Sequence, residues 1–132
     1  DVPFPLKCKT VLSRYTWLTE RVQREVAHPR FRMHCAVHEL EAWILSQPEI
    51  LSTAVADALP KSTSNPEELN FDRPPSRILR RLYWQKRRHR FMKTIDGVNL
   101  IQKLDPDVAY GKCPFLKRLL DDMLYLARRK GQ

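Results

Sequence analysis

The segment Phe31–Ser46, FRMHCAVHELEAWILS, contains a change of hydrophobic period that decides the predicted fold. Over residues 31–37 apolar and other side chains alternate, which is typical of a half-buried strand. The side chains on the apolar side of this segment are Phe31, Met33, Cys35 and Val37. After His38 the spacing becomes that of a helix face, and Pro48 limits this helix to a few turns. The segment therefore predicts a strand that is followed directly by a short helix.

Glu39 and Glu41 lie at this predicted junction, where α/β proteins commonly place their ligands. Carboxylates two residues apart lie on the same side of an extended segment, so they could share a divalent cation. On a regular helix the two side chains would diverge by about 200°. The alternative is structural: Glu39 stabilises the first helical turn and Glu41 is solvated. The spacing alone leaves both interpretations open.

Residues 1–132 are expected to form a single domain, and the segments outside the predicted strand are expected to be mainly helical. Apolar side chains recur every three or four residues over 7–27, 76–88 and the segment that begins at Pro114, and all three are predicted helices. Residues 61–76 are rich in Pro, Ser and Asn and predict a long surface loop. The fold class predicted from the sequence is thus α/β, with one clear strand followed by helices.

Composition narrows the classes of protein to which the chain could belong. The 132 residues carry 24 Lys and Arg against 15 Asp and Glu, and the net charge of +9 favours nucleic acid or an acidic protein as partner. No apolar run is long enough to span a membrane, and no secretory segment is present. Three widely spaced cysteines match neither a disulfide framework nor a zinc site, which favours a cytoplasmic protein. The opening DVPFP resembles the end of a strand and predicts a longer parent protein.

A second candidate site is the basic helix with the residues that follow it. Arginines surround an aromatic side chain there, as in surfaces that bind phosphates and stack bases. The candidate nucleic-acid-binding residues are Arg77, Arg80, Arg81, Trp84, Arg87, Arg88, Arg90 and Lys93. The alternative is a solvated face on which Trp84 covers part of the core. Lys93 could hold a phosphate or pair with a carboxylate of the site, or it could be a surface lysine before an ordinary turn.

Four segments of the sequence resemble one prokaryotic family. They are AVHELEAWILSQPEIL, NPEELNFDRPPSRILRRLY, MKTIDG and KCPFLKRLLDDML. Together they cover most of the chain, and they resemble the domain of unknown function 4276 (DUF4276). That family is similar to TOPRIM-type proteins, which are small α/β domains with clustered carboxylates that bind Mg²⁺. Relatives in this class occur beside ABC-type ATPases in antiphage defence, and some act as nucleases.

The resemblance implies roles for particular residues. Glu39 and Glu41 correspond to the acidic pair of the family's ExE motif, as catalytic residues and ligands of Mg²⁺ or Mn²⁺. The resemblance also makes Asp1 a third candidate ligand, as what remains of a further acidic segment. Lys93 and Asp96 match the KTxDG-like segment. The chain departs from the TOPRIM pattern because the first Glu-bearing strand and a complete DxD-like segment are missing from it.

The function expected from this resemblance is that of a Mg²⁺-dependent nuclease effector in antiphage defence. It would act on DNA or RNA in the cytoplasm, as part of a hetero-oligomer with an ABC-type ATPase subunit. The alternative is a catalytically inactive module that docks on an ATPase or on nucleic acid through its basic helix. The sequence does not decide between the two.

Overall fold

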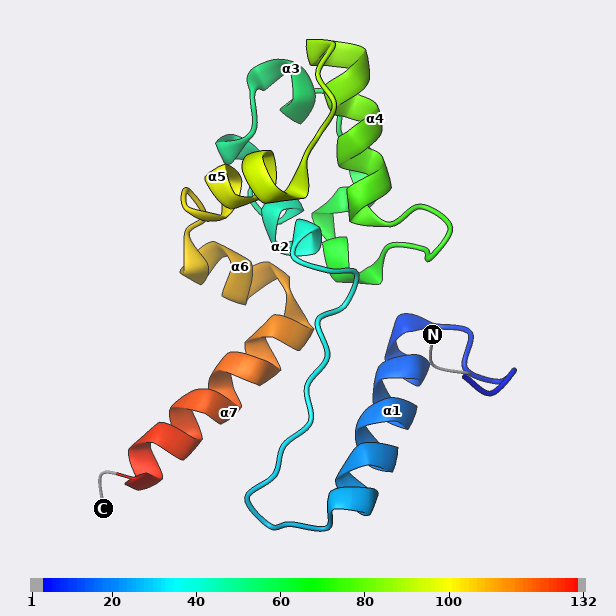
Figure 1. Ribbon diagram of the computed structural model, residues 1–132, viewed down its shortest axis with the longest axis vertical. Helices are drawn as coiled ribbons and strands as arrows, with labels where there is room; N and C mark the ends of the chain where they lie inside the picture. The colour runs from blue at the N-terminus through cyan, green and yellow to red at the C-terminus, as the bar shows by residue number, and fades with distance from the viewer. Residues whose placement is uncertain (1–3, 131–132) are drawn as a thin grey trace.

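A computed structural model describes residues 4–130, and these residues form helices and turns (Figure 1). The α-helices are α1 (Val11–Val26), α2 (Glu41–Leu45), α3 (Thr53–Ala56), α4 (Pro75–Arg87), α5 (Val98–Ile101), α6 (Pro106–Lys112) and α7 (Pro114–Lys130). Three short 3-10 helices, η1 (Pro48–Ile50), η2 (Lys61–Ser64) and η3 (Pro66–Glu68), and one π-helical turn, η4 (Lys93–Gly97), connect them. The predicted helices at 7–27, 76–88 and from Pro114 are confirmed.

The prediction of an α/β fold with a strand at residues 31–37 is wrong, since the part of the chain that the structure describes contains no strand. This segment is extended and runs between α1 and α7 (Figure 1). Val37 packs with Tyr15 of α1 and Phe115 of α7. The alternating pattern therefore reflects an extended backbone that packs between two helices, with no neighbouring strand to complete a sheet.

His34 ties the same segment to both helices through its imidazole ring. Its Nδ1 lies 3.1 Å from the Tyr15 hydroxyl of α1, and its Nε2 lies 2.9 Å from Oδ2 of Asp122 on α7. At the start of α1, Thr10 and Ser13 form reciprocal side-chain and backbone hydrogen bonds, a capping box that fixes where the helix begins. The long helices α1 and α7 are thus joined through the extended segment.

The largest core lies among α2, α3, α4 and α5, at the upper end of the molecule in Figure 1. Four inward-facing residues of α4 were predicted from their spacing, and all four are buried: Ile78, Leu79, Leu82 and Tyr83. They pack against Ile44 and Leu45 of α2 and Val55 of α3. This core fixes α2 and α4, the two helices beside which the candidate site lies.

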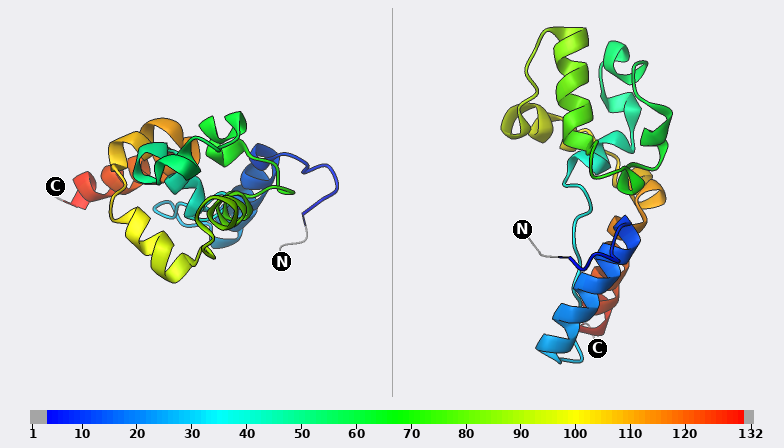
Figure 2. Two further views of the ribbon diagram at one scale, coloured as in Figure 1. Left: turned by 90° about the horizontal axis from the view of Figure 1, so that it is seen from above. Right: turned by 90° about the vertical axis from the view of Figure 1, so that its right-hand side faces the viewer.

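The segment 61–76 differs from the predicted surface loop. It forms η2 and η3, and it buries Thr63, Glu67 and Leu69. Figure 2 shows that α6 leads from the upper core into α7, which extends away from that core. Among the described helices, none has both the length and the apolarity that crossing a lipid bilayer requires. The cytoplasmic location stays a prediction.

Candidate functional site

The chain turns where the extended segment meets α2, and two residues with left-handed backbone angles make this turn. The φ angle is 60° at His38 and 78° at Glu39. Few residues other than glycine adopt such angles, because the Cβ atom crowds the backbone. A strained residue of this kind costs about 1–3 kcal/mol and is common at functional sites. The turn places Glu39 just before α2 and Glu41 in its first turn.

Glu39, Glu41 and Lys93 form one ionic cluster, called here the acid–lysine site. The Lys93 ammonium is hydrogen-bonded to Oε2 of Glu39 and lies 3.3 Å from Oε1 of Glu41. The Glu41 side chain is only 4% exposed, whereas those of Glu39 and Lys93 are 54% and 41% exposed. A buried carboxylate requires a compensating charge, and Lys93 supplies it. The structure therefore brings three of the predicted residues together, with both carboxylates directed at one cation.

The contacts in the acid–lysine site shift the pKa of both exposed partners. The hydrogen bond from Lys93 holds the pKa of Glu39 below its usual value of 4.5, although partial burial opposes the shift. Ser76, in the first turn of α4, contributes a further lowering of this pKa. The hydrogen bond to Glu39 in turn raises the pKa of Lys93. Glu39 and Lys93 are consequently both charged at neutral pH.

The lowered pKa of Glu39 predicts an acid-dependent loss of stability. Its contribution is present above pH 4.5 and is lost as the pH falls through the lowered pKa of the folded state. We expect Glu39→Gln to reduce the free energy of unfolding at neutral pH by less than about 1 kcal/mol, because the pair is exposed. This difference should vanish in acid, as measured by urea denaturation across the pH range. Glu49→Gln, at an exposed carboxylate of η1, is the control; a difference that does not change with pH would contradict the prediction.

Two cavities adjoin the acid–lysine site, and Lys93 lines both. One has a volume of about 370 Å³, and apart from the charged cluster its walls include Leu40, Ile44 and Ile101. The other, of about 460 Å³, is lined by Lys93 with Arg80 and Arg90. The acidic pair thus lies beside a cavity with basic walls, where an anionic group could approach the Lys93 ammonium.

The predicted nucleic-acid-binding residues are all exposed. Arg80, Arg90 and Lys93 line the basic cavity just described, and the others lie elsewhere on or near α4. Arg77 and Arg81 line a third and larger cavity, on a different side of α4 from Arg80. Trp84 is 58% exposed, so it covers little of the core. Arg87 and Arg88 line neither the basic cavity nor this larger one. Arg87 stacks on the Tyr83 ring, and Arg88 follows α4 with a left-handed backbone. The exposed face of α4 therefore lies between the two cavities.

The side chains of the acid–lysine site fit part of a magnesium coordination sphere. In sites that process phosphate esters, one or two carboxylates hold Mg²⁺, while water and substrate phosphates complete the coordination. Glu39 and Glu41 already converge on one positive charge, that of Lys93. Asp1, the third predicted ligand, lies outside the described residues. Among residues 4–130 no group of three acidic, His or Cys side chains is placed to hold a metal.

Two further acidic residues have structural roles that the sequence did not reveal. Glu67 is fully buried, and its carboxylate accepts hydrogen bonds from the backbone N–H groups of Phe115 (2.7 Å) and Leu116 (3.2 Å), at the start of α7. Asp96 accepts from the backbone N–H of Met92 at 2.7 Å and pairs with His89 at 2.9 Å. Asp96 thus shapes the η4 turn that carries Lys93. The sequence did offer one signal for Glu67 of NPEEL. Acidic side chains stabilise helix N-termini, and Pro114 marks the start of a helix that Glu67 could cap.

Comparison with known proteins gives the family. Residues 3–124 match the family described as domain of unknown function DUF4276. The chain belongs to the DUF4276 family. No curated protein and no solved structure matches it significantly. The family assignment from the four sequence segments is confirmed, whereas the TOPRIM-like relationship and the link to antiphage defence are not tested by this match.

The four segments that resemble DUF4276 meet in pairs in the structure. HELEAW supplies Glu39 and Glu41, and KTIDG supplies Lys93, so these two segments together form the acid–lysine site. NPEEL and KCPFL meet where Glu67 caps the first turn of α7. One pair of DUF4276 segments thus builds the ionic cluster, and the other holds the C-terminal helix in place.

Proposed function

We propose that this DUF4276 chain carries the acidic centre of a Mg²⁺-dependent nuclease, which works with an ABC-type ATPase in antiphage defence in the cytoplasm. The observation that carries the proposal is the acid–lysine site: a strained turn directs two carboxylates at one cation, beside a cavity with basic walls. The ATPase partner and the defence role rest on the sequence resemblance alone. The substrate class rests on the basic residues around α4.

Each residue has a defined task in this proposal. Glu39 and Glu41 hold Mg²⁺ (or Mn²⁺), which when bound supplies an activated water and stabilises negative charge on the phosphate. Lys93 has a flexible stem and a half-exposed ammonium group, so it can leave the carboxylates and donate to a phosphate oxygen. Arg80 and Arg90 line the same cavity as Lys93 and bind the flanking phosphates.

Removal of the Lys93 charge tests whether the two carboxylates are a cation site. The ammonium group competes with a metal ion for the same oxygens, so Lys93→Met should bind Mn²⁺ about two- to fivefold more tightly than the parent. The same variant should cleave an oligonucleotide more slowly, because the phosphate loses a donor. Isothermal titration calorimetry and a gel assay measure the two effects. Lys103→Met, at an exposed lysine after α5, is the matched control; weaker Mn²⁺ binding in Lys93→Met would contradict the proposal.

A second candidate function is a non-enzymatic module that docks on an ATPase or on nucleic acid through its basic residues. One observation favours it: within residues 4–130 only two carboxylates converge, and Lys93 already compensates their charge. This alternative predicts nucleic-acid binding that is the same with and without Mn²⁺. It also predicts no heat of Mn²⁺ binding that depends on Glu39 or Glu41.

A further inference from the structure

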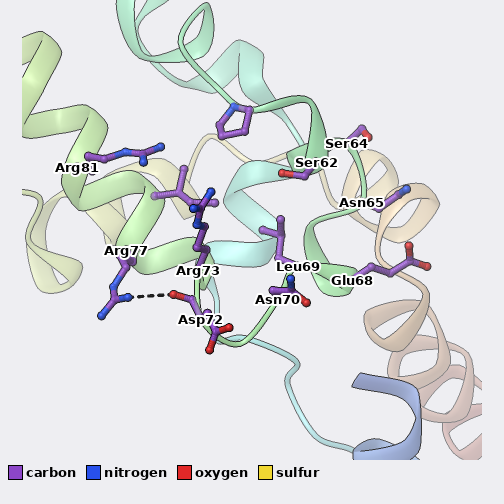
Figure 3. Close-up of a pocket in the computed structure, with 12 residues that line it drawn as sticks. Ser62, Ser64, Asn65, Glu68, Leu69, Asn70, Asp72, Arg73, Arg77 and Arg81 are labelled. Carbon is purple, nitrogen blue, oxygen red and sulfur yellow. Dashed lines mark hydrogen bonds between the residues drawn. The ribbon is translucent and has the colours of Figure 1, made fainter. Parts of the chain in front are cut away.

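A cavity larger than the two beside the acid–lysine site lies on a different side of α4 from Arg80 and Lys93, between this helix and the segment 60–73. It has a volume of about 810 Å³, which is within the range of ligand sites. Figure 3 shows the arginines Arg73, Arg77 and Arg81 on one side, and Ser62, Ser64 and Asn65 on the other. The cavity is thus lined by three arginines and by neutral hydrogen-bonding groups. Two exposed carboxylates, Glu68 and Asp72, also line it, so the arginines leave it with a positive balance.

The two walls suit different parts of one ligand. Guanidinium groups bind phosphate oxygens with paired N–H donors. Arg77 is held in place, since its Nη1 donates to the backbone carbonyl of Asp72 at 2.9 Å. Serine hydroxyls and the amide of Asn65 offer both donors and acceptors, as the edge of a nucleobase requires. Leu69 and Ile78 add apolar surface to the cavity.

A concave site of this kind selects unpaired nucleotides. In a duplex the base edges that pair are hidden, and the phosphates lie on a convex surface, so a duplex cannot place a base in this cavity. The exposed ring of Trp84 follows Arg77 and Arg81 at helical spacing on α4, and it offers a stacking surface for the next base. Phosphate-binding and stacking groups therefore follow one another along α4, and the base-binding groups lie across the cavity on segment 60–73.

We propose that this cavity binds one nucleotide of single-stranded nucleic acid, with phosphates along Arg73, Arg77 and Arg81 and the base toward Ser62 and Asn65. The inference deepens the proposed function by naming single strands as the substrate class. Ser76, which contributes to the electrostatics of Glu39, directly precedes Arg77 in α4. A strand bound in the cavity can therefore continue across the start of α4 toward the acid–lysine site.

Binding without cleavage tests this inference. Fluorescence anisotropy with a short labelled oligothymidylate is measured in EDTA, so that no metal-dependent reaction occurs. The double variant Arg73→Gln/Arg81→Gln should bind about tenfold or more weakly, and the log–log salt dependence should fall by about 0.7 for each arginine. Trp84→Ala should bind about fivefold or more weakly with an unchanged salt dependence, because it removes only stacking.

The control variant has the same net charge as the double variant of the cavity, but it leaves the cavity residues unchanged. Arg24→Gln/Arg128→Gln removes exposed arginines of α1 and α7 and should bind within twofold of the parent. Equal losses in this control and in the cavity variant would overturn the inference, as would duplex DNA of the same length binding as tightly as the single strand. Competition by thymidine monophosphate at the concentration of the oligonucleotide would also overturn it, in favour of a free nucleotide as ligand.

The single-strand proposal and the nuclease proposal can fail independently of each other. Glu39→Gln/Glu41→Gln should keep the full affinity for the oligothymidylate, since neither residue lines the cavity. If this variant and the parent bind the strand alike but neither binds Mn²⁺, the nuclease proposal fails and the single-strand site stands. If Mn²⁺ binds and the strand affinity is insensitive to Arg73 and Arg81, the single-strand site fails alone.

Discussion

Glu41→Gln is expected to lower the rate of phosphodiester cleavage at least about 100-fold, because the proposed Mg²⁺ site loses its buried carboxylate. The change keeps the shape of the side chain, and the Lys93 ammonium retains its hydrogen bond to Glu39. The free energy of unfolding should therefore change by no more than about 1 kcal/mol. Cleavage of a labelled single strand in Mn²⁺, together with urea denaturation of the same preparation, measures both quantities.

Glu49→Gln separates a specific effect of Glu41 from a general loss of negative charge, since Glu49 is exposed on η1. This control should cleave at the rate of the parent. The decisive result against a metal site is undiminished Mn²⁺ binding in Glu39→Gln/Glu41→Gln. In that case the basic residues remain as a docking surface, and the chain is the non-enzymatic module described above.

Glu67→Ala is expected to reduce the free energy of unfolding by about 2–4 kcal/mol. The backbone N–H groups of Phe115 and Leu116 lose their acceptor, and each buried donor left unpaired costs about 1–3 kcal/mol. Part of this cost is offset, because burial of the Glu67 carboxyl, which raises its pKa, is itself unfavourable. Urea or thermal denaturation followed by circular dichroism measures the loss.

The neighbouring Glu68→Ala is the matched control, since Glu68 is exposed and belongs to the same η3 turn. Its free energy of unfolding should stay within about 0.5 kcal/mol of the parent. A similar loss in both variants would show that η3 itself, and not the cap on α7, is what stabilises the chain. Glu67→Gln should fall between the two, because one amide oxygen remains as an acceptor.

The helices were predictable because their signals are local. The spacing of Ile78, Leu79 and Leu82 identified the buried face of α4, and Asp105 before Pro106 marked the start of α6, where its side chain accepts from the N–H of Asp107 at 2.9 Å. The state of residues 31–37 was not predictable in this way. A period of two shows that a backbone is extended, but a strand exists only if another strand pairs with it. That partner is a matter of tertiary structure.

The same distinction between local signals and long-range contacts applies to the candidate site. The spacing of Glu39 and Glu41 was enough to suggest that both carboxylates could share one cation, and the resemblance pointed to Lys93 as a residue of the same family pattern. The contact between Lys93 and the pair spans more than fifty residues of sequence, and no local pattern encodes it. The role of Glu67 was missed for the same reason, because its hydrogen bonds join η3 to α7.

In the proposed site, the ammonium group between Glu39 and Glu41 would make the binding of a divalent cation and the binding of a phosphate thermodynamically linked. A divalent ion that takes its place releases one positive charge, which is then available to an incoming phosphate; a phosphate that attracts Lys93 likewise frees the carboxylates for the ion. Each ligand should therefore tighten the other by the same factor, as reciprocity of coupling requires. In the absence of both, the lysine keeps the cluster paired, so either ligand alone would have to compete with this ion pair and would bind more weakly than it does beside the other.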